Sequence, residues 1–320
     1  MSRRHRPAPE LFDAAAAGDR TALARLLSLI ERGDDEARVV GRLAYPHSGE
    51  GYTVGLTGAP GAGKSTLTSS LIGHLRARDL EVAVLAIDPS SPFSGGAILG
   101  DRVRMQDHAT DPGVFIRSMA TRGHLGGLTL ATPEAVRLLD AVGRKWILVE
   151  TVGVGQVEVE VAGKADTTVV VVNPGWGDSI QANKAGLMEI ADVFVINKAD
   201  RKGVEETSRD LMQMLDLSDL PHDSWRPPIV PTVGSTGEGV PELWDAVLAH
   251  RAYAESSGLL HERRTFRLRE ELREIIAQRL GQRARQICSG ERWDELTEAV
   301  VGRITDPWTA ADEMLAPVDA

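Results

Sequence analysis

The sequence predicts an α/β fold in which a doubly wound, mostly parallel sheet carries helical extensions at both ends of the chain. Three observations support this prediction. From residue 53 onwards, short apolar runs alternate with segments of helical periodicity. The run at 169–172 is apolar on both faces, as expected of a strand buried between two helical layers. Beyond residue 256 the strand-like runs stop. Functional loops are then expected at the carboxyl ends of the strands.

Residues 1–50 are predicted to form an N-terminal helical extension. Between about residues 10 and 31, six apolar side chains fall roughly on one helical face: Leu11, Ala15, Leu23, Leu26, Leu27 and Ile30. The pair Gly18-Asp19 is expected to break this segment into two helices. A loop that contains Pro46, Gly49 and Gly51 then leads into the main domain.

Residues 51–256 form the predicted sheet domain. Strands are expected at 53–57, 82–87, 114–117, 146–150, 167–173, 193–197 and 229–232. Helices are expected at 64–78, 132–143, 181–190, 204–215 and 240–251. The helical segments fill the gaps between the strands, which is the order of a doubly wound sheet.

Residues 257–320 are predicted to form a C-terminal helical region. Two apolar stripes, separated by a turn at 288–291, consist of Leu268, Leu272, Ile275, Ile276 and Leu280, and of Trp293, Leu296, Val300 and Ile304. Stripes outside the sheet need a partner, and an interchain helical hairpin would supply one.

The first C-terminal helix is dense in arginine. Its arginines are Arg263, Arg264, Arg267, Arg269, Arg273, Arg279, Arg283 and Arg285. We interpret them as a solvated face with local pairs to Glu270, Glu271 and Glu274. A nucleic-acid patch is the weaker alternative, because acids interleave the arginines and aromatic residues are few.

The composition excludes several classes of protein. The chain has 320 residues, of which 42% are hydrophobic, so wholesale disorder is excluded. Its net charge of −10 argues against nucleic-acid binding by bulk positive charge. The single cysteine, Cys288, excludes an intramolecular disulfide and any multi-cysteine metal site. No stretch has the apolar length of a membrane span, and we expect a reducing, cytoplasmic setting with no membrane partner.

Residues 58–65 read Gly-Ala-Pro-Gly-Ala-Gly-Lys-Ser and match the phosphate-loop pattern G-x-x-x-x-G-K-[ST] between a strand and a helix. Glycines let the backbone amides point inward at a phosphate, and the helix N-terminus adds positive potential. Lys64 is expected to reach the β- and γ-phosphates, and Ser65 to ligate magnesium. The predicted nucleotide contacts here are Gly58, Ala59, Pro60, Gly61, Ala62, Gly63, Lys64, Ser65 and Thr66.

Acidic residues at strand ends are candidates for the magnesium shell. Glu150 ends a strand, and Gly153 follows it with a backbone that can swing towards a γ-phosphate. Asp88 ends another strand, whereas Asp101 begins a predicted helix, where a helix cap and a magnesium role are equally compatible with the spacing. Gln156 could orient the attacking water, although a solvated loop glutamine is the simpler interpretation.

The segment Asn197-Lys-Ala-Asp200 follows a buried strand and predicts guanine selection. One carboxylate can accept from both N1–H and the exocyclic N2 amine of guanine, whereas adenine lacks that amine, so Asp200 discriminates between the purines. Asn197 is expected to fix the loop geometry, and Lys198 to lie along the ring. Ser235, Thr236 and Gly237 could support the base from the other side, or form an ordinary turn.

These parts stand in the order of a GTPase, and the likeness extends further. Residues 88–105, 118–128, 150–156 and 181–192 resemble the MeaB/ArgK/MMAA family, the G-protein chaperones of adenosylcobalamin-dependent methylmalonyl-CoA mutase. The resemblance covers nearly the whole chain. It implies a GTPase that binds the mutase, gates cofactor loading and protects the mutase from inactivation. It also implies a homodimer whose C-terminal helices form the dimer contact.

The resemblance also implies residue roles. It supports Ser65, Asp88, Asp101 and Glu150 around Mg²⁺, and Asn197, Lys198 and Asp200 at the guanine of GTP or GDP. The resulting catalytic candidates are Lys64, Asp88, Asp101, Glu150 and Gln156. The loop from 175 to 184 resembles an additional switch of the family that signals to the mutase. Val157 departs from the family, where a small polar residue is more usual.

Two other functions compete with this interpretation. A nickel-insertion GTPase is expected to show a Cys or His cluster, whereas Cys288 is alone and the histidines are scattered. A P-loop kinase for a small molecule would have no need of Asp200. We further expect slow intrinsic turnover, because neither Arg102 nor Arg104 is certain to act as an arginine finger in cis.

Overall fold

The computed structural model describes residues 6–89, 106–121, 127–151, 164–175, 189–217 and 224–316. The chain divides into two compact units, Met1–Arg267 and Leu268–Ala320. The first contains the sheet and the second contains C-terminal helices. The boundary lies within one long helix, so the predicted domain limit at residue 257 precedes the division between the units.

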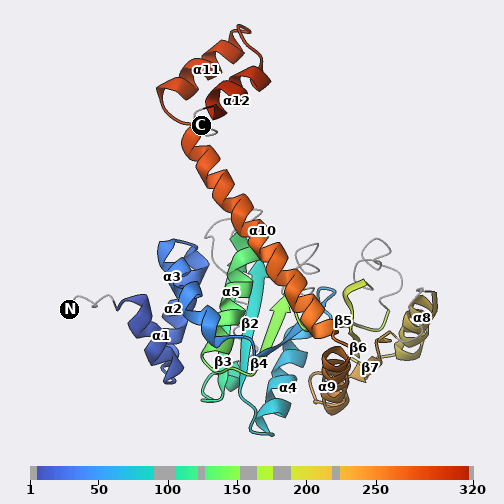
Figure 1. Cartoon of the computed structure of the whole chain (residues 1–320). Coiled ribbons are helices and arrows are strands. Elements are labelled where there is room, and N and C mark those ends of the chain that lie inside the picture. Colours follow the sequence, from blue (N-terminus) through green and yellow to red (C-terminus); the bar gives the residue numbers. More distant parts are fainter. Residues whose placement is uncertain are drawn as a thin grey trace. The chain divides into compact units, whose positions relative to one another are not determined.

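Seven strands within the described residues form one parallel sheet in the order β3-β2-β4-β1-β5-β6-β7 (Figure 1). The strands are β1 (Tyr52–Gly58), β2 (Val82–Pro89), β3 (Val114–Thr121), β4 (Trp146–Thr151), β5 (Thr167–Val172), β6 (Val193–Asn197) and β7 (Ile229–Thr232). β1 lies at the centre, with β4 and β5 on either side. The predicted doubly wound sheet is confirmed, and each strand lies on the apolar run that predicts it.

Helices cover both faces of this sheet. On one face, α4 (Lys64–Arg76), α8 (Val204–Leu217) and α9 (Val240–Ser256) pack in a cluster that includes Val82 and Val84 of β2. On the other face, α5 (Gly127–Ala141) and the N-terminal helices pack against Ala83, Leu85 and Ile87. Alternate side chains of one strand therefore enter two separate apolar clusters, as the pleat of a strand requires. The helix predicted at 181–190 lies outside the described residues, apart from its last two positions.

Three N-terminal helices share the core of the first unit. They are α1 (Ala8–Ala16), α2 (Arg20–Arg32) and α3 (Asp35–Ala44). The predicted break at 18–19 is present because the Asp19 side chain accepts from the amides of Thr21 and Ala22 and caps α2. Leu26 and Leu27 are fully buried in the cluster that contains α5 and β2. The N-terminal segment is thus a layer of the sheet-containing unit, and it includes α3, which was not among the predicted helices.

The remaining helices are α10 (Leu259–Ile287), α11 (Glu291–Val301) and α12 (Pro307–Leu315). α10 contains the first predicted apolar stripe, and α11 contains the second except for Ile304, which lies beyond the end of the helix. Residues 288–290 separate the two helices. α12 was not predicted; the side chain of Asp306 caps it by accepting from the amides of Trp308 and Thr309. Within the described ranges, no helix combines the length and apolar character needed to cross a membrane.

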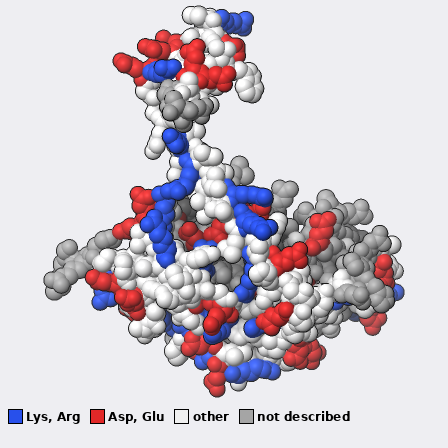
Figure 2. All heavy atoms as spheres, viewed as in Figure 1, with Lys and Arg blue, Asp and Glu red and all other residues white. Residues whose placement is uncertain are grey.

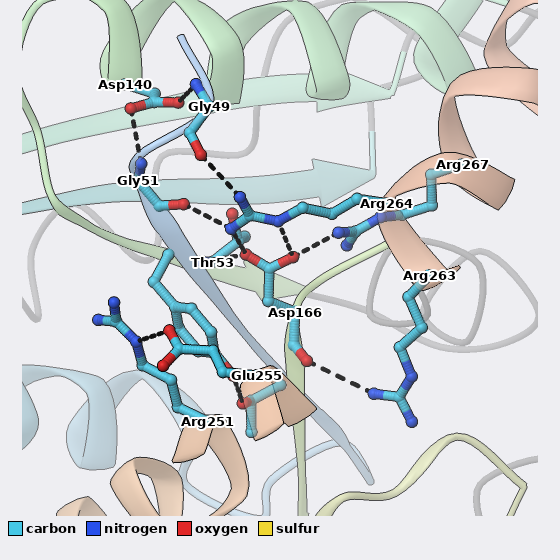
Figure 3. A network of polar contacts seen from close by, with 12 residues as sticks. Gly49, Gly51, Thr53, Asp140, Asp166, Arg251, Glu255, Arg263, Arg264 and Arg267 are labelled. Carbon is cyan, nitrogen blue, oxygen red and sulfur yellow. Dashed lines mark hydrogen bonds and ion pairs between the residues drawn. The ribbon is translucent and has the colours of Figure 1, made fainter. Parts of the chain in front are cut away.

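The first arginines of α10 are anchored to buried carboxylates, which corrects the prediction of a solvated face with local pairs. Arg264 and Arg267 both pair with Asp166, just before β5 (Figure 3). Arg263 pairs with Asp192, just before β6. The two aspartates are 2% and 3% exposed, respectively. Arg264 also donates to the carbonyl oxygens of Gly49 and Gly51. These bonds join segments far apart in sequence. Arg273, further along the helix, does make the predicted local pair with Glu270.

Charges of both signs are interspersed on the face of the first unit that Figure 2 shows. The buried ion pairs at the start of α10 lie at the amino ends of β5 and β6. The loops that carry the predicted nucleotide motifs follow the opposite, carboxyl ends of the strands.

Candidate functional site

The predicted nucleotide motifs meet at the carboxyl edge of the sheet. The phosphate loop follows β1, Glu150 is near the end of β4, and the Asn-Lys-Ala-Asp segment begins at the end of β6. The loop at 233–239 follows β7. Because the strands are parallel and β4, β1, β5, β6 and β7 are consecutive neighbours, all four segments leave the sheet on the same side.

Two glycines of the phosphate loop are required by geometry. Gly58 has φ 138°, and a Cβ there would lie 1.9 Å from the carbonyl oxygen of Val171 in β5. Gly63 has φ 90°, and a Cβ there would lie 2.5 Å from Nδ2 of Asn197. A side chain at either position would clash and would also strain the backbone. The loop therefore lies tightly against both β5 and the base-selecting segment.

Lys64 is the first residue of α4 and is buried, with 7% exposure. Its ammonium group donates to the carbonyl oxygens of Gly58, at 2.7 Å, and Ala59, at 3.3 Å. The positive charge is thus held inside the phosphate loop. The N-terminus of α4 points at the same loop and adds the positive end of its helix dipole. Thr66, half-buried, lies in the first turn of this helix.

Ser65, in the first turn of α4, contacts Glu150, near the end of β4. Ser65 Oγ donates to Glu150 Oε1 at 2.6 Å, and both side chains are buried. The register of β1 and β4 places Leu56 beside Glu150, which explains why the carboxylate reaches the start of α4. A hydroxyl and a carboxylate are hard oxygen donors of the kind that magnesium prefers, so this pair fits the predicted metal.

Asn197 connects the base-selecting segment to two other loops. Its Nδ2 donates to Ala62 O at 2.8 Å, in the phosphate loop. Its Oδ1 accepts from the amide of Gly234 at 3.0 Å and from the hydroxyl of Thr232 at 3.2 Å. The side chain is 2% exposed, so these bonds are made away from water. Asn197 therefore connects the phosphate loop to the loop after β7.

The neighbouring residues of the segment face solvent to different degrees. Lys198 has φ 61° and donates from Nζ to Gly61 O at 2.6 Å, so it reaches over the phosphate loop. Asp200 is exposed. Ser235, Thr236 and Gly237 form a turn in which the amides of Thr236 and Gly237 donate to Val233 O. This turn lies at the same edge of the sheet as Asp200, because the amide of Ala199, next to Asp200, donates to the carbonyl oxygen of Thr232 at the end of β7.

Several predicted site residues lie outside the described residues. They are Asp101, Gly153 and Gln156, together with Arg102, Arg104 and residues 176–184 of the predicted additional switch. The backbone of Asp88 belongs to β2, but its side chain is not described. Among the described residues, no group of three or more His, Cys, Asp or Glu side chains is arranged to hold a metal ion.

Three residues that no sequence motif predicts connect the loops of this site. Thr232 and Gly234 bond to Asn197, and Ser70 of α4 donates to Gly234 O at 2.6 Å. No motif marks these positions, because each bond joins segments that are distant in sequence. The glycine at 234, two residues after the end of a predicted strand on the active edge, was the one available signal.

A parallel sheet with a phosphate loop after its central strand, bonded through Asn197 to a guanine-type segment, defines a P-loop GTPase. A family model described as methylmalonyl-CoA mutase-associated GTPase MeaB matches residues 23–288. The chain belongs to the MeaB family. It is a GTPase, an enzyme that binds and hydrolyses a guanine nucleotide.

Individual relatives agree with this assignment. A putative GTPase of Pyrococcus horikoshii is 49% identical over 98% of both chains. The mouse methylmalonic aciduria type A homolog, a mitochondrial protein, is 35% identical over 79% of this chain and 65% of its own length. The crystal structure of an LAO/AO transport system kinase matches 98% of both chains with a TM-score of 0.72 and 26% identity. The resemblance predicted from the motifs is therefore confirmed at the level of the family.

Proposed function

We propose that the chain is a GTP-controlled chaperone of adenosylcobalamin-dependent methylmalonyl-CoA mutase, which gates cofactor loading and protects the mutase from inactivation. One observation supports the nucleotide part: Asn197 bonds simultaneously to the phosphate loop and to the loop after β7. This connection fixes the distance between a phosphate-binding and a base-binding element. The mutase part is supported by the description of the family and by the motif resemblance.

In this proposal the chain's own groups bind the two ends of GTP. The amides of the phosphate loop and the ammonium group of Lys64 hold the phosphates, with help from the dipole of α4. The carboxylate of Asp200 accepts from N1–H and the N2 amine of guanine, and Lys198 lies along the ring. Ser235, Thr236 and Gly237 support the base from the other side.

Ser65 and Glu150 would hold Mg²⁺, together with Asp88 and Asp101. When bound, Mg²⁺ neutralises charge on the β- and γ-phosphates. Gly153 would turn its amide towards the γ-phosphate, and Gln156 would orient the attacking water. We propose slow turnover by the isolated chain, on the order of 10⁻² per second or less, as is usual without a stimulating partner.

The C-terminal region, 257–320, is the proposed homodimer contact. In the second unit, Leu268, Leu272, Ile276 and Leu280 of α10 are between 44% and 62% exposed. Such an apolar stripe is what an interchain helical hairpin would bury. Sedimentation of the full chain, compared with a variant in which Leu272 and Ile276 are both changed to Glu, tests this. We expect a dimer for the natural chain and a monomer for the variant.

The partner is tested by co-purification with adenosylcobalamin-dependent mutases in the presence of GDP and of a non-hydrolysable GTP analogue. We expect methylmalonyl-CoA mutase to be retained and its apparent affinity to differ between the two nucleotides. Equal retention of an unrelated cobalamin-dependent mutase, or no retention in either nucleotide state, would refute the mutase assignment.

A further inference from the structure

Helix α4, which begins at the phosphate loop, carries two neighbouring serines that bond to two different segments. Ser70 Oγ donates to Gly234 O at 2.6 Å. Ser69 Oγ lies 3.1 Å from Nε2 of His108, and the same ring nitrogen lies 2.9 Å from Ser69 O. Both serines are half-buried, and neither belongs to the phosphate-loop pattern. The helix that begins at the phosphate loop is therefore bonded, through Ser70, to the loop after β7.

Both the amide and the carbonyl oxygen of Gly234 are hydrogen-bonded to side chains. Its amide donates to Asn197 Oδ1 at 3.0 Å, and its carbonyl oxygen accepts from Ser70. A Cβ at this position would lie 3.2 Å from the amide nitrogen of Leu67 and 3.2 Å from Asn197 Oδ1. These contacts are tighter than ordinary packing, so the backbone of Gly234 fits closely between α4 and Asn197.

The loop that Gly234 belongs to is a closed turn. The amide of Val233 donates to Glu238 O at 2.9 Å, and the amide of Gly237 donates to Val233 O at 3.0 Å. The bonds that Gly234 makes to Asn197 and Ser70 hold this closed turn to the phosphate-loop side, in addition to the pairing of β7 with β6 that precedes it. A shift of Gly234 would carry Ser235, Thr236 and Gly237 with it.

We propose that Ser70 is a positioning residue for guanine recognition, which acts through Gly234 and does not touch the nucleotide. Its hydroxyl holds the base-side loop at a set distance from the helix that begins at the phosphate loop. This inference rests on the guanine site of the proposed function. It assigns to the middle of α4 a part in base binding that is separate from the phosphate contacts at its first turn.

The test uses the full chain with Ser70→Ala, Ser70→Thr and the matched neighbour Ser69→Ala. Two quantities are measured: the dissociation rate of a fluorescent GDP and competition by inorganic pyrophosphate, which has no base. We expect Ser70→Ala to release GDP about 3- to 10-fold faster, as loss of one neutral hydrogen bond implies. Its pyrophosphate affinity should be unchanged. Ser70→Thr, which retains the hydroxyl, and Ser69→Ala should release GDP at the natural rate.

A second variant approaches the same contact from the other side. Gly234→Ala adds a Cβ against α4 and Asn197, so it should also speed GDP release without changing pyrophosphate affinity. It decides the question if Ser70→Ala does not fold. Natural GDP release in both variants, or weakening of pyrophosphate in the same proportion as GDP, would overturn the inference.

Asp200→Asn in the same assay separates this inference from the proposed function. An unchanged preference for GDP over xanthosine diphosphate would refute the proposed guanine site and the inference with it. A changed preference, combined with natural GDP release by both Ser70→Ala and Gly234→Ala, would refute the inference alone.

Discussion

The hydroxyl of Ser65 donates to the carboxylate of Glu150 across 2.6 Å, and this bond joins the first turn of α4 to the end of β4. The two residues are 85 positions apart in sequence and both are buried. Their meeting depends on β1 and β4 being neighbours in the sheet. The pair provides the described part of the proposed magnesium shell.

Replacing Glu150 tests that shell. Glu150→Gln keeps the size of the side chain but removes its charge, so GTP hydrolysis should need more Mg²⁺ and fall by about 10- to 100-fold at a fixed Mg²⁺ concentration. Steady-state hydrolysis over a Mg²⁺ titration measures this. Glu50→Gln, at an exposed position paired with Lys145, is the control and should behave as the natural chain. Identical Mg²⁺ dependence in the two variants would remove Glu150 from the proposed shell.

Replacing Lys64 tests the phosphate contact. Lys64→Ala removes the ammonium group held inside the phosphate loop, and we expect GTP binding to be lost with the fold retained. Titration calorimetry measures binding, and circular dichroism measures the fold. Lys145→Ala, which removes a lysine with 65% side-chain exposure, should leave the affinity unchanged. Natural GTP affinity in Lys64→Ala would contradict the proposed site.

Replacing Asp200 tests base selection. Asp200→Asn exchanges two acceptor oxygens for an amide, so GTP should bind more weakly and xanthosine triphosphate more tightly. A competition assay with both nucleotides measures the change. Asp210→Asn, at an exposed position of α8, also removes one negative charge and should alter neither affinity. If Asp200→Asn keeps the natural preference, Asp200 does not contact the base.

The ion pairs at the start of α10 predict an acid limit to stability. Burial by itself would raise the pKa of Asp166, but the hydrogen bonds and charges of Arg264 and Arg267 outweigh it and hold the pKa below its ordinary value. Burial would likewise raise the pKa of Asp192, but the hydrogen bonds and charges of His250 and Arg263 outweigh it, so this pKa is also lowered. A lowered native pKa stabilises the fold above the unfolded value of 3.8. This contribution is lost as the pH falls from about 3.8 through the native pKa.

Asp166→Asn tests the stability argument. It leaves Arg264 and Arg267 without their buried carboxylate, so the free energy of unfolding at neutral pH should fall by about 3–5 kcal/mol. Urea denaturation at several pH values measures this, and the difference from the natural chain should shrink below about pH 3.8. Asp35→Asn is the control, because Asp35 is 92% exposed and makes a local pair with Arg38. Equal stability of the two variants would show that the anchor contributes little.

Local sequence patterns predicted most of the regular structure. An apolar run such as 169–172 is a property of neighbouring residues, and a strand buried on both faces requires one. Helix α3 was missed although its buried residues, Ala37, Val40 and Ala44, recur at helical spacing. The phosphate loop and the guanine-type segment were found because each is a short contiguous pattern. Ser70 was not found, since a serine within a helix carries no signal of its distant partner.

For the arginines of α10, the local sequence pattern predicted the wrong partners. The local spacing of Arg263, Arg264 and Arg267 favours pairs with nearby glutamates on a solvated helix. In the fold these side chains reach Asp166 and Asp192, where charges almost removed from water require partners. Pairing with a buried carboxylate thus overrode the local pattern.

By itself, the order of residues determined the class of fold, the phosphate-binding turn and the family, because each is written in contiguous stretches of chain. Only the tertiary structure decided which loops Asn197 connects, that Ser65 meets Glu150, and that the start of α10 is anchored to the sheet. Those outcomes depend on which strands become neighbours. Strand neighbours are selected by the burial of whole apolar faces and by the partners that buried charges require, and neither is visible in a short window of sequence.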